Sequence, residues 1–362
     1  MNVLRATAVA ALIAVPLALG GTHAIAVSDA ARQAGTAAAI HVVSHKRESP
    51  RVTQYLVSTP SLGMSSKTPL RIDVILPTGY AAHPDRHYPV LYALPGTDST
   101  ADQWVDQTDT LAATKGLALI VVSVDGGYNT DGGGWYTNWV DQHTRLGTAD
   151  WETFHTREVV PWVDSHFRTL RSRDERAIVG ISQGGFGSLS YAARHPDLFG
   201  AAAAFSGAVD VYQNPVCEAG ASALISAIVA TDGVEPLAAF GDPVTDAANW
   251  RAHDPGSNVT KLHKTKVDLY VSDGVPAPSD LTDPADAAAG AGLEAVMHLS
   301  NECFKEAADA AGLHFGWHEY AVGLHTEPYM NRDLLDYLPR LMRFFAAHRP
   351  GPFSKQRVGA TT

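Results

Sequence analysis

The chain has 362 residues, a length that a single large domain can occupy. Hydrophobic residues make up 45% of the sequence and charged residues 18%, a balance that excludes a disordered chain. The formal net charge of -11 argues against nucleic acid or an anionic membrane surface as the main partner, because both would repel the protein.

The first 26 residues have the pattern of a signal peptide. A positive start over Met1–Arg5 precedes the apolar run Ala6–Leu19, and Ala24-Ile25-Ala26 fits a small-x-small cleavage site. The apolar run is shorter than the ~20 residues that cross a bilayer. We therefore predict a secreted protein, extracellular or associated with the cell wall, without stable membrane insertion.

The remaining chain divides into a leader, a domain and a tail. Residues 27–51 lack apolar periodicity and are predicted to be a flexible leader, and residues 349–362 a flexible tail. Between them, residues 52–348 contain an alternating segment, Leu70–Leu76, and continuous apolar runs over Val90–Leu94, Ala118–Val124 and Ala177–Ile181. Further strands are predicted over Ala201–Phe205, Val267–Val271 and Phe315–Ala321.

Helical stretches alternate with these strands, most clearly over Trp151–Phe167 and Tyr329–Ala346. Parallel neighbouring strands need such crossover connections, so the order predicts an α/β fold with a mainly parallel central sheet and helices on both faces. The segment of about residues 210–264 is longer than a usual connection and is predicted to be an insert beside the sheet.

Cys217 and Cys303 are the only cysteines. An exported chain meets oxidising conditions, so they can form one disulfide, and two buried thiols remain an equal alternative. The 16 histidines include no H-E-x-x-H motif and no tight cluster with cysteine, so no metal site is predicted. No dinucleotide or phosphate-binding motif is present in the sequence, so no cofactor is predicted.

A nucleophile motif, G-x-S-x-G, follows one of the predicted strands. Gly180-Ile181-Ser182-Gln183-Gly184 lies between the strand Ala177–Ile181 and a helix-compatible stretch. In this context the motif forms a strained turn that lifts the serine hydroxyl above the sheet, as in the α/β-hydrolase fold. We predict Ser182 as the nucleophile of an acyl-transfer reaction.

Acyl transfer also needs two N–H donors for the oxyanion. The backbone N–H of Gln183, directly after the nucleophile, is the first. The second is predicted at Thr97, because the strand Val90–Leu94 ends in a Pro95-Gly96 turn that precedes it.

The base and its acid should follow the nucleophile along the chain. His325 lies in the loop between the last predicted strand and the closing helix, where this fold presents its base. Two acids remain open as its partner. Asp273 directly follows the strand Val267–Val271, and Glu294 lies in a helix-compatible stretch further on.

These features together resemble the antigen 85 mycolyltransferases and the wider esterase D-like family, over roughly residues 60–341. The likeness is most specific in Trp151-Glu152-Thr153-Phe154, in the G-x-S-x-G motif, and in Leu293-Glu294 with Ser300-Asn301 and Phe304. The last segment is similar to the one that carries the family's catalytic glutamate. The resemblance therefore implies Glu294 as the acid, whereas strand position favours Asp273.

The departures from this family concern the substrate. Its oxyanion turn, Asp-Gly-Leu-Arg, reads Pro95-Gly96-Thr97-Asp98 here, so Asp98 stands in place of an arginine. Of the family's sugar-contacting positions, only Asp210 is kept. The resemblance implies that Asp98 and Asp210 bind substrate, while the lost cations argue against trehalose mycolyl transfer.

The sequence thus predicts a secreted serine carboxylic-ester hydrolase of the α/β-hydrolase fold. It would act through an acyl-enzyme on a small-molecule, lipid or sugar ester. One alternative is an acyltransferase that passes the acyl group to a sugar or glycerol hydroxyl, and another is a non-catalytic cell-surface binding protein. The sequence does not predict an oligomeric state.

Overall fold

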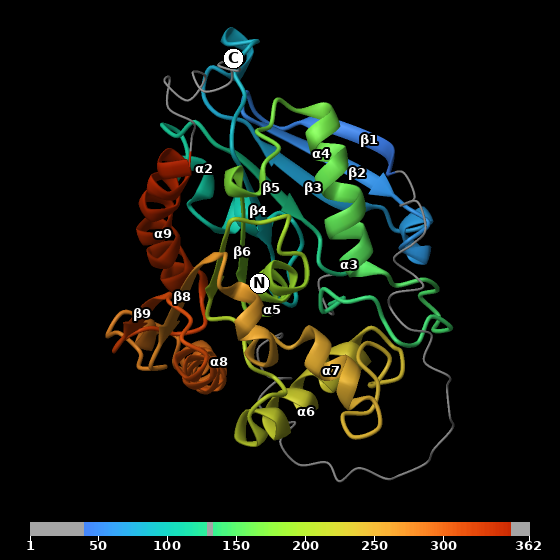
Figure 1. Cartoon of the computed structure of the whole chain (residues 1–362), viewed down its shortest axis with the longest axis vertical. Coiled ribbons are helices and arrows are strands. Elements are labelled where there is room, and N and C mark those ends of the chain that lie inside the picture. Colours follow the sequence, from blue (N-terminus) through green and yellow to red (C-terminus); the bar gives the residue numbers. More distant parts are fainter. Residues whose placement is uncertain (1–39, 129–132, 349–362) are drawn as a thin grey trace, which may run out of the picture.

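The computed structural model describes residues 40–128 and 133–348, which are built around one nine-stranded sheet (Figure 1). The strands lie in the order β1-β2-β3-β5-β4-β6-β7-β8-β9. Their bounds are β1 His41–Arg47, β2 Val52–Ser58, β3 Leu70–Ile75, β4 Val90–Leu94, β5 Ile120–Val124, β6 Arg176–Ile181, β7 Ala201–Phe205, β8 Lys266–Ser272 and β9 Gly316–Tyr320. The first three strands are antiparallel to their neighbours, and the pairs from β5 to β9 are parallel.

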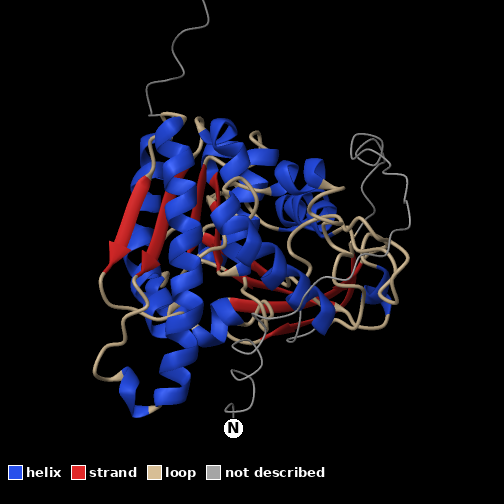
Figure 2. Ribbon diagram, turned by 90° about the horizontal axis from the view of Figure 1, so that it is seen from below, coloured by secondary structure: helices blue, strands red, loops and turns tan. Residues whose placement is uncertain are grey.

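Helices cover both faces of the sheet, as predicted (Figures 1 and 2). None of those in the described ranges has the length and apolar character needed to cross a bilayer. The helices are α2 Thr110–Ala113, α3 Trp151–Thr153, α4 Val160–His166, α5 Gln183–Arg194, α6 Pro215–Thr231, α7 Ala247–His253, α8 Pro284–Ala310 and α9 Glu327–His348, with a π-helical stretch, Phe154–Val159, joining α3 to α4.

The sheet has a hydrophobic core on each face, and alternate side chains of the central strands pack into one core or the other. Val90 and Tyr92 of β4 contribute to the core that contains α5, α8 and the α3–α4 segment. Leu91 and Ala93 contribute to the opposite core, which α9 covers. Because successive residues of a strand point to opposite faces, a strand buried on both faces is apolar throughout. This is the physical reason why the continuous apolar runs marked the central strands.

The prediction of a flexible leader over residues 27–51 was wrong for residues 41–47, and residues 27–39 lie outside the described residues. Residues 41–47 form β1, an edge strand that pairs antiparallel with β2. Its side chains are nearly all exposed, so no apolar alternation marks it in the sequence. Backbone hydrogen bonds to β2 hold this strand, and a prediction based on hydrophobic period could not find it. The predicted signal peptide, residues 1–26, and the predicted tail, residues 349–362, lie outside the described residues.

The insert predicted at about residues 210–264 is largely helical. It contains α6, α7 and a 3₁₀ segment, Gly256–Leu262. A disulfide between Cys217 of α6 and Cys303 of α8 joins it to the rest of the domain. The bond closes a loop with a sequence separation of 86 residues. In the chain-entropy model such a loop is worth about 4.5 kcal/mol.

A buried ionic cluster connects the α3–α4 segment to α5 and α7. The carboxylate of Glu152 lies 2.8 Å from Arg194 Nε and 2.7 Å from His195 Nε2, and its other oxygen lies 3.4 Å from His253 Nε2. Burial raises the pKa of Glu152, but these donors and charges outweigh it and hold the pKa well below its usual range. The Trp151-Glu152 motif therefore has a structural role here.

A pair of buried aspartates, Asp210 and Asp254, connects the insert to the loop after β7 by hydrogen bonds. Asp210 and Asp254 have no exposed surface, and each accepts a backbone N–H, from Asn214 and Val211 respectively. Burial, followed by the negative charge of Asp254, raises the pKa of Asp210 to about 7. The space is tight, because a Cβ on Gly256 would lie 2.3 Å from Asp210 Oδ2.

This pair makes stability depend on pH. The pKa of Asp210 is about 7 in the folded protein and about 4 in an unfolded chain, so the folded state holds a proton that the unfolded state releases. The contribution of this proton to the free energy of unfolding is complete below the pKa of Asp210 in the unfolded chain, and it is lost as pH rises through the pKa in the folded protein. Between about pH 5 and pH 8, we expect wild type to lose on the order of 2 kcal/mol more unfolding free energy than Asp210→Asn.

Urea unfolding at several pH values measures this difference. Asp85→Asn, at an exposed position, is the matched control and should follow the wild-type pH profile. Parallel profiles for wild type and Asp210→Asn would contradict the raised pKa of Asp210.

Candidate active site

The predicted nucleophile occupies a strained turn between β6 and α5. Ser182 has φ 55° and ψ -118°, a conformation that a residue with a Cβ rarely adopts. Its N–H donates to Phe205 O of the adjacent strand, and its carbonyl accepts the N–H groups of Gly185 and Phe186 at the start of α5. These bonds hold a partly exposed serine at the carboxyl end of the sheet.

The two glycines of the motif are required by close backbone contacts. A Cβ at Gly180 would lie 1.9 Å from Gly184 O, and a Cβ at Gly184 would lie 2.2 Å from Leu94 O. Both distances are far shorter than any real contact, and both involve backbone that cannot rotate away. The motif is therefore the steric solution for bringing α5 this close to β4 and β6.

The predicted oxyanion residues lie together beside Ser182. The loop after β4 approaches the serine closely, since a Cβ on Gly96 would be 3.3 Å from the Ser182 Cβ. The Gly96 N–H donates to Gln103 Oε1, and Thr97 supplies the next amide. Gln183 Nε2 donates to Thr97 Oγ1 at 3.1 Å, which ties this loop to the first turn of α5. At that position the Gln183 N–H is one of those that a helix leaves without an internal partner.

His325 and Glu294 are in contact. His325 Nδ1 lies 3.0 Å from Glu294 Oε2, and both side chains are buried, at 8% and 0% exposed. The backbone N–H of His325 donates to Gly290 O, one turn before Glu294 on α8. The loop that carries the histidine is thus bound to the helix that carries the acid.

Glu294 is ionised despite its burial. Burial raises its pKa, but hydrogen bonds from His325, from the Ser206 hydroxyl at 2.7 Å and from the Ser272 N–H at 2.8 Å outweigh this effect, and the net pKa lies below its usual range. An ionised acceptor at this distance fixes Nδ1–H as the donor and leaves Nε2 of His325 to act as a base.

The alternative acid, Asp273, points elsewhere. It directly follows β8, as predicted, but its carboxylate is 41% exposed and lies 3.5 Å from His298 Nε2. Of the two predicted substrate-binding residues, Asp98 is exposed beside Thr97 and has a positive φ of 61°. The prediction for Asp210 was wrong, because the side chain is fully buried and offers a substrate no surface.

The sequence-based reasoning missed two serines that hold the acid. Ser206 follows β7 with φ 44°, and Ser272 ends β8. Both lie at the carboxyl ends of parallel strands on the same side of β6: β7 is its neighbour and β8 is the next strand. For Ser206 the available signal was a polar residue directly after an apolar strand, because parallel strands bring such ends to one edge of the sheet. Ser272 donates through its backbone N–H, which no side-chain pattern marks.

An apolar pocket lies between α6 and α8, beside the candidate site. Its cavity volume is about 100 Å³, and the pocket is partly open to solvent. Met297 in its wall follows Glu294 by one turn of α8, and Ala208 follows Ser206 by two residues. Other side chains in the wall include Trp135, Val211, Cys217 and Leu224.

Comparisons with known proteins agree with this architecture. A family model described as putative esterase matches residues 64–341. Esterase Rv1288 of Mycobacterium tuberculosis is 29% identical over 305 residues, which cover 84% of this chain and 62% of that protein. The diacylglycerol acyltransferase/mycolyltransferase Ag85A of M. tuberculosis is 30% identical over 267 residues, covering 72% of this chain and 74% of the relative.

Two solved structures show the same fold. M. tuberculosis MPT51 superposes with a TM-score of 0.61 at 22% identity, covering 81% of this chain and 97% of that one. An S-formylglutathione hydrolase from Agrobacterium tumefaciens superposes with a TM-score of 0.60 at 18% identity, covering 84% of this chain and 99% of that one. With the family model spanning most of the domain, the chain belongs to the esterase family of α/β-hydrolase enzymes that also includes the antigen 85 acyltransferases.

Proposed function

We propose that the protein is a secreted carboxylic-ester hydrolase that works through an acyl-enzyme on Ser182. The observation that supports this most is the 3.0 Å contact between His325 Nδ1 and the buried Glu294 carboxylate. Ser206, which also donates to Glu294, directly follows Phe205, whose carbonyl accepts the N–H of Ser182. A disulfide agrees with export, because such bonds persist in oxidising compartments.

In the proposed mechanism, Ser182 Oγ attacks the ester carbonyl while His325 Nε2 takes the hydroxyl proton. Glu294 holds the imidazole and stabilises its positive charge. The N–H groups of Thr97 and Gln183 receive the developing oxyanion. His325 then gives its proton to the leaving alcohol, and water, activated by the same base, releases the acid.

Variants of the three proposed catalytic residues test this mechanism. We expect Ser182→Ala and His325→Ala to lower kcat/KM for p-nitrophenyl esters by at least ~10⁴-fold, and Glu294→Gln by about 10²- to 10⁴-fold, because the amide no longer stabilises the imidazolium. A fluorophosphonate probe should label wild type on Ser182, as located by mass spectrometry, and should not label Ser182→Ala.

Asp273→Asn is the matched control for the acid and should keep near wild-type turnover. If Asp273→Asn rather than Glu294→Gln abolished turnover, Asp273 would be the acid. A folded wild-type protein with neither labelling nor turnover would exclude the esterase and favour a non-catalytic binding protein.

The apolar pocket between α6 and α8 supports an acyl chain as the part of the substrate that is buried. Its wall is almost entirely hydrocarbon, which favours a lipid tail over a sugar. The substrate's alcohol portion would lie on the side of Thr97, where we propose that the exposed Asp98 contacts it.

Filling this pocket should change the preferred acyl length. Ala221→Trp places a large ring in the wall, and we expect it to lower kcat/KM for long-chain p-nitrophenyl esters by about 10-fold or more while leaving the acetate ester almost unchanged. Ala223→Trp, on the exposed face of α6, is the control and should keep the wild-type profile. Equal losses for all chain lengths would show that the pocket does not hold the acyl chain.

The acyltransferase relatives favour a second candidate, transfer of the acyl group to an alcohol. Both reactions share the acyl-enzyme, and only the acceptor differs. With glycerol, trehalose and water competing, we expect free acid as the main product. Predominant ester formation, measured by chromatography of the products, would instead identify an acyltransferase.

A further inference from the structure

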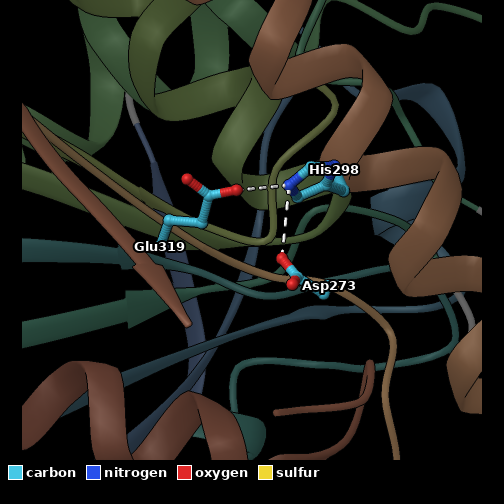
Figure 3. Close-up of side chains that lie close together, drawn as sticks. All are labelled: Asp273, His298 and Glu319. Carbon is cyan, nitrogen blue, oxygen red and sulfur yellow. Dashed lines mark hydrogen bonds and ion pairs between the residues drawn. The ribbon is translucent and has the colours of Figure 1, made fainter. Parts of the chain in front are cut away.

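A second group of side chains converges outside the proposed active site. Asp273 follows β8, His298 lies on α8 and Glu319 lies on β9, and Figure 3 shows the three pointing toward one another. One nitrogen or oxygen atom from each lies within 4.8 Å of those from the other two. None of the three has a part in the mechanism proposed above.

One nitrogen of His298 faces both carboxylates. Its Nε2 lies 2.8 Å from Glu319 Oε1 and 3.5 Å from Asp273 Oδ1. An imidazole nitrogen carries at most one hydrogen, so it makes one good hydrogen bond at most, and 3.5 Å is long for a second. A divalent cation placed among all three groups would take one ligand atom from each of them.

The surroundings hold the three groups in place. Val271 of β8 pairs with Glu319 of β9, so Asp273, two residues further, extends from the same face of the sheet. The Asp273 N–H donates to Tyr320 O, and the second oxygen of Glu319 accepts a hydrogen bond from Trp317 Nε1 at 3.0 Å. Metal-binding carboxylates are typically oriented by such an outer hydrogen bond.

We propose that Asp273, His298 and Glu319 form a site for a divalent transition-metal ion, with Zn²⁺ as its best match. One imidazole nitrogen and two carboxylate oxygens suit Zn²⁺, with water in the remaining position, whereas Ca²⁺ prefers six to eight oxygens. The exposed carboxylates leave the site open to an ion from solution. Lys305, whose positive charge helps to lower the pKa of Glu319, acts against the ion; its Nζ lies 5.5 Å from the centroid of the Trp317 ring.

The site would also brace the proposed acid from outside. Ser272, whose N–H binds Glu294, directly precedes Asp273, and His298 follows Glu294 by one turn of α8. A bound ion would cross-link β8, α8 and β9 at this point. The metal proposal does not rest on the catalytic one, because binding is measured without substrate.

Titration of the full mature chain without a histidine tag, using Zn²⁺ in a calorimeter, tests the site. We expect one equivalent to bind to wild type, an affinity at least ~100-fold lower for His298→Ala, and at least ~10-fold lower for Glu319→Gln. His263→Ala, at an exposed position elsewhere, is the control and should bind as wild type does. Co²⁺ in place of Zn²⁺ should give visible absorption bands in wild type that His298→Ala lacks.

Zn²⁺ should also raise the unfolding midpoint of wild type and of Glu294→Gln but not of His298→Ala, because only a folded site binds the ion. Absence of stoichiometric binding to wild type would overturn the proposal. Equal binding to wild type and to both site variants would overturn it as well, because the three residues would then form only an ion pair.

Discussion

The buried carboxylate of Glu294 is the point on which the candidate site depends. It lies on a helix, yet its partners come from the ends of two strands and from the loop after a third: Ser206, Ser272 and His325. An unpaired charge at this depth would be strongly unfavourable, so these donors and the carboxylate require one another. The position of His325 relative to the sheet is fixed through this contact.

The parallel sheet makes the convergence possible. Strands β6, β7 and β8 are neighbours and parallel, so the turn of Ser182, Ser206 and Ser272 all lie at one edge. The insert then builds on the same edge, where α6 and α8 enclose an apolar pocket and the disulfide between Cys217 and Cys303 joins the two helices. Chemistry would be supplied by the strand ends, and selectivity by the insert.

The strongest sequence signals were those that local sterics enforce. Continuous apolar runs marked the central strands because both faces of those strands are buried, and the glycines of the motif marked the turn because no other residue fits. β1 gave no such signal, since it is exposed and is held by backbone bonds that any sequence can make. Asp210 resembled a ligand-binding residue, but its burial depends on packing that the sequence does not display.

The sequence by itself determined the order of the strands from β3 to β9, the place of Ser182 and the loop of His325. It left open whether Glu294 or Asp273 is the acid that partners His325. Both can reach the edge of the sheet, and a sequence pattern does not show in which direction a side chain points. The tertiary structure brings Glu294 to His325 and places Asp273 beside Glu319 and beside His298, which lies one turn further along α8 than Glu294. The cluster of Asp273, His298 and Glu319 could not be predicted from the sequence. Its members come from three separate elements, which meet only once the sheet forms.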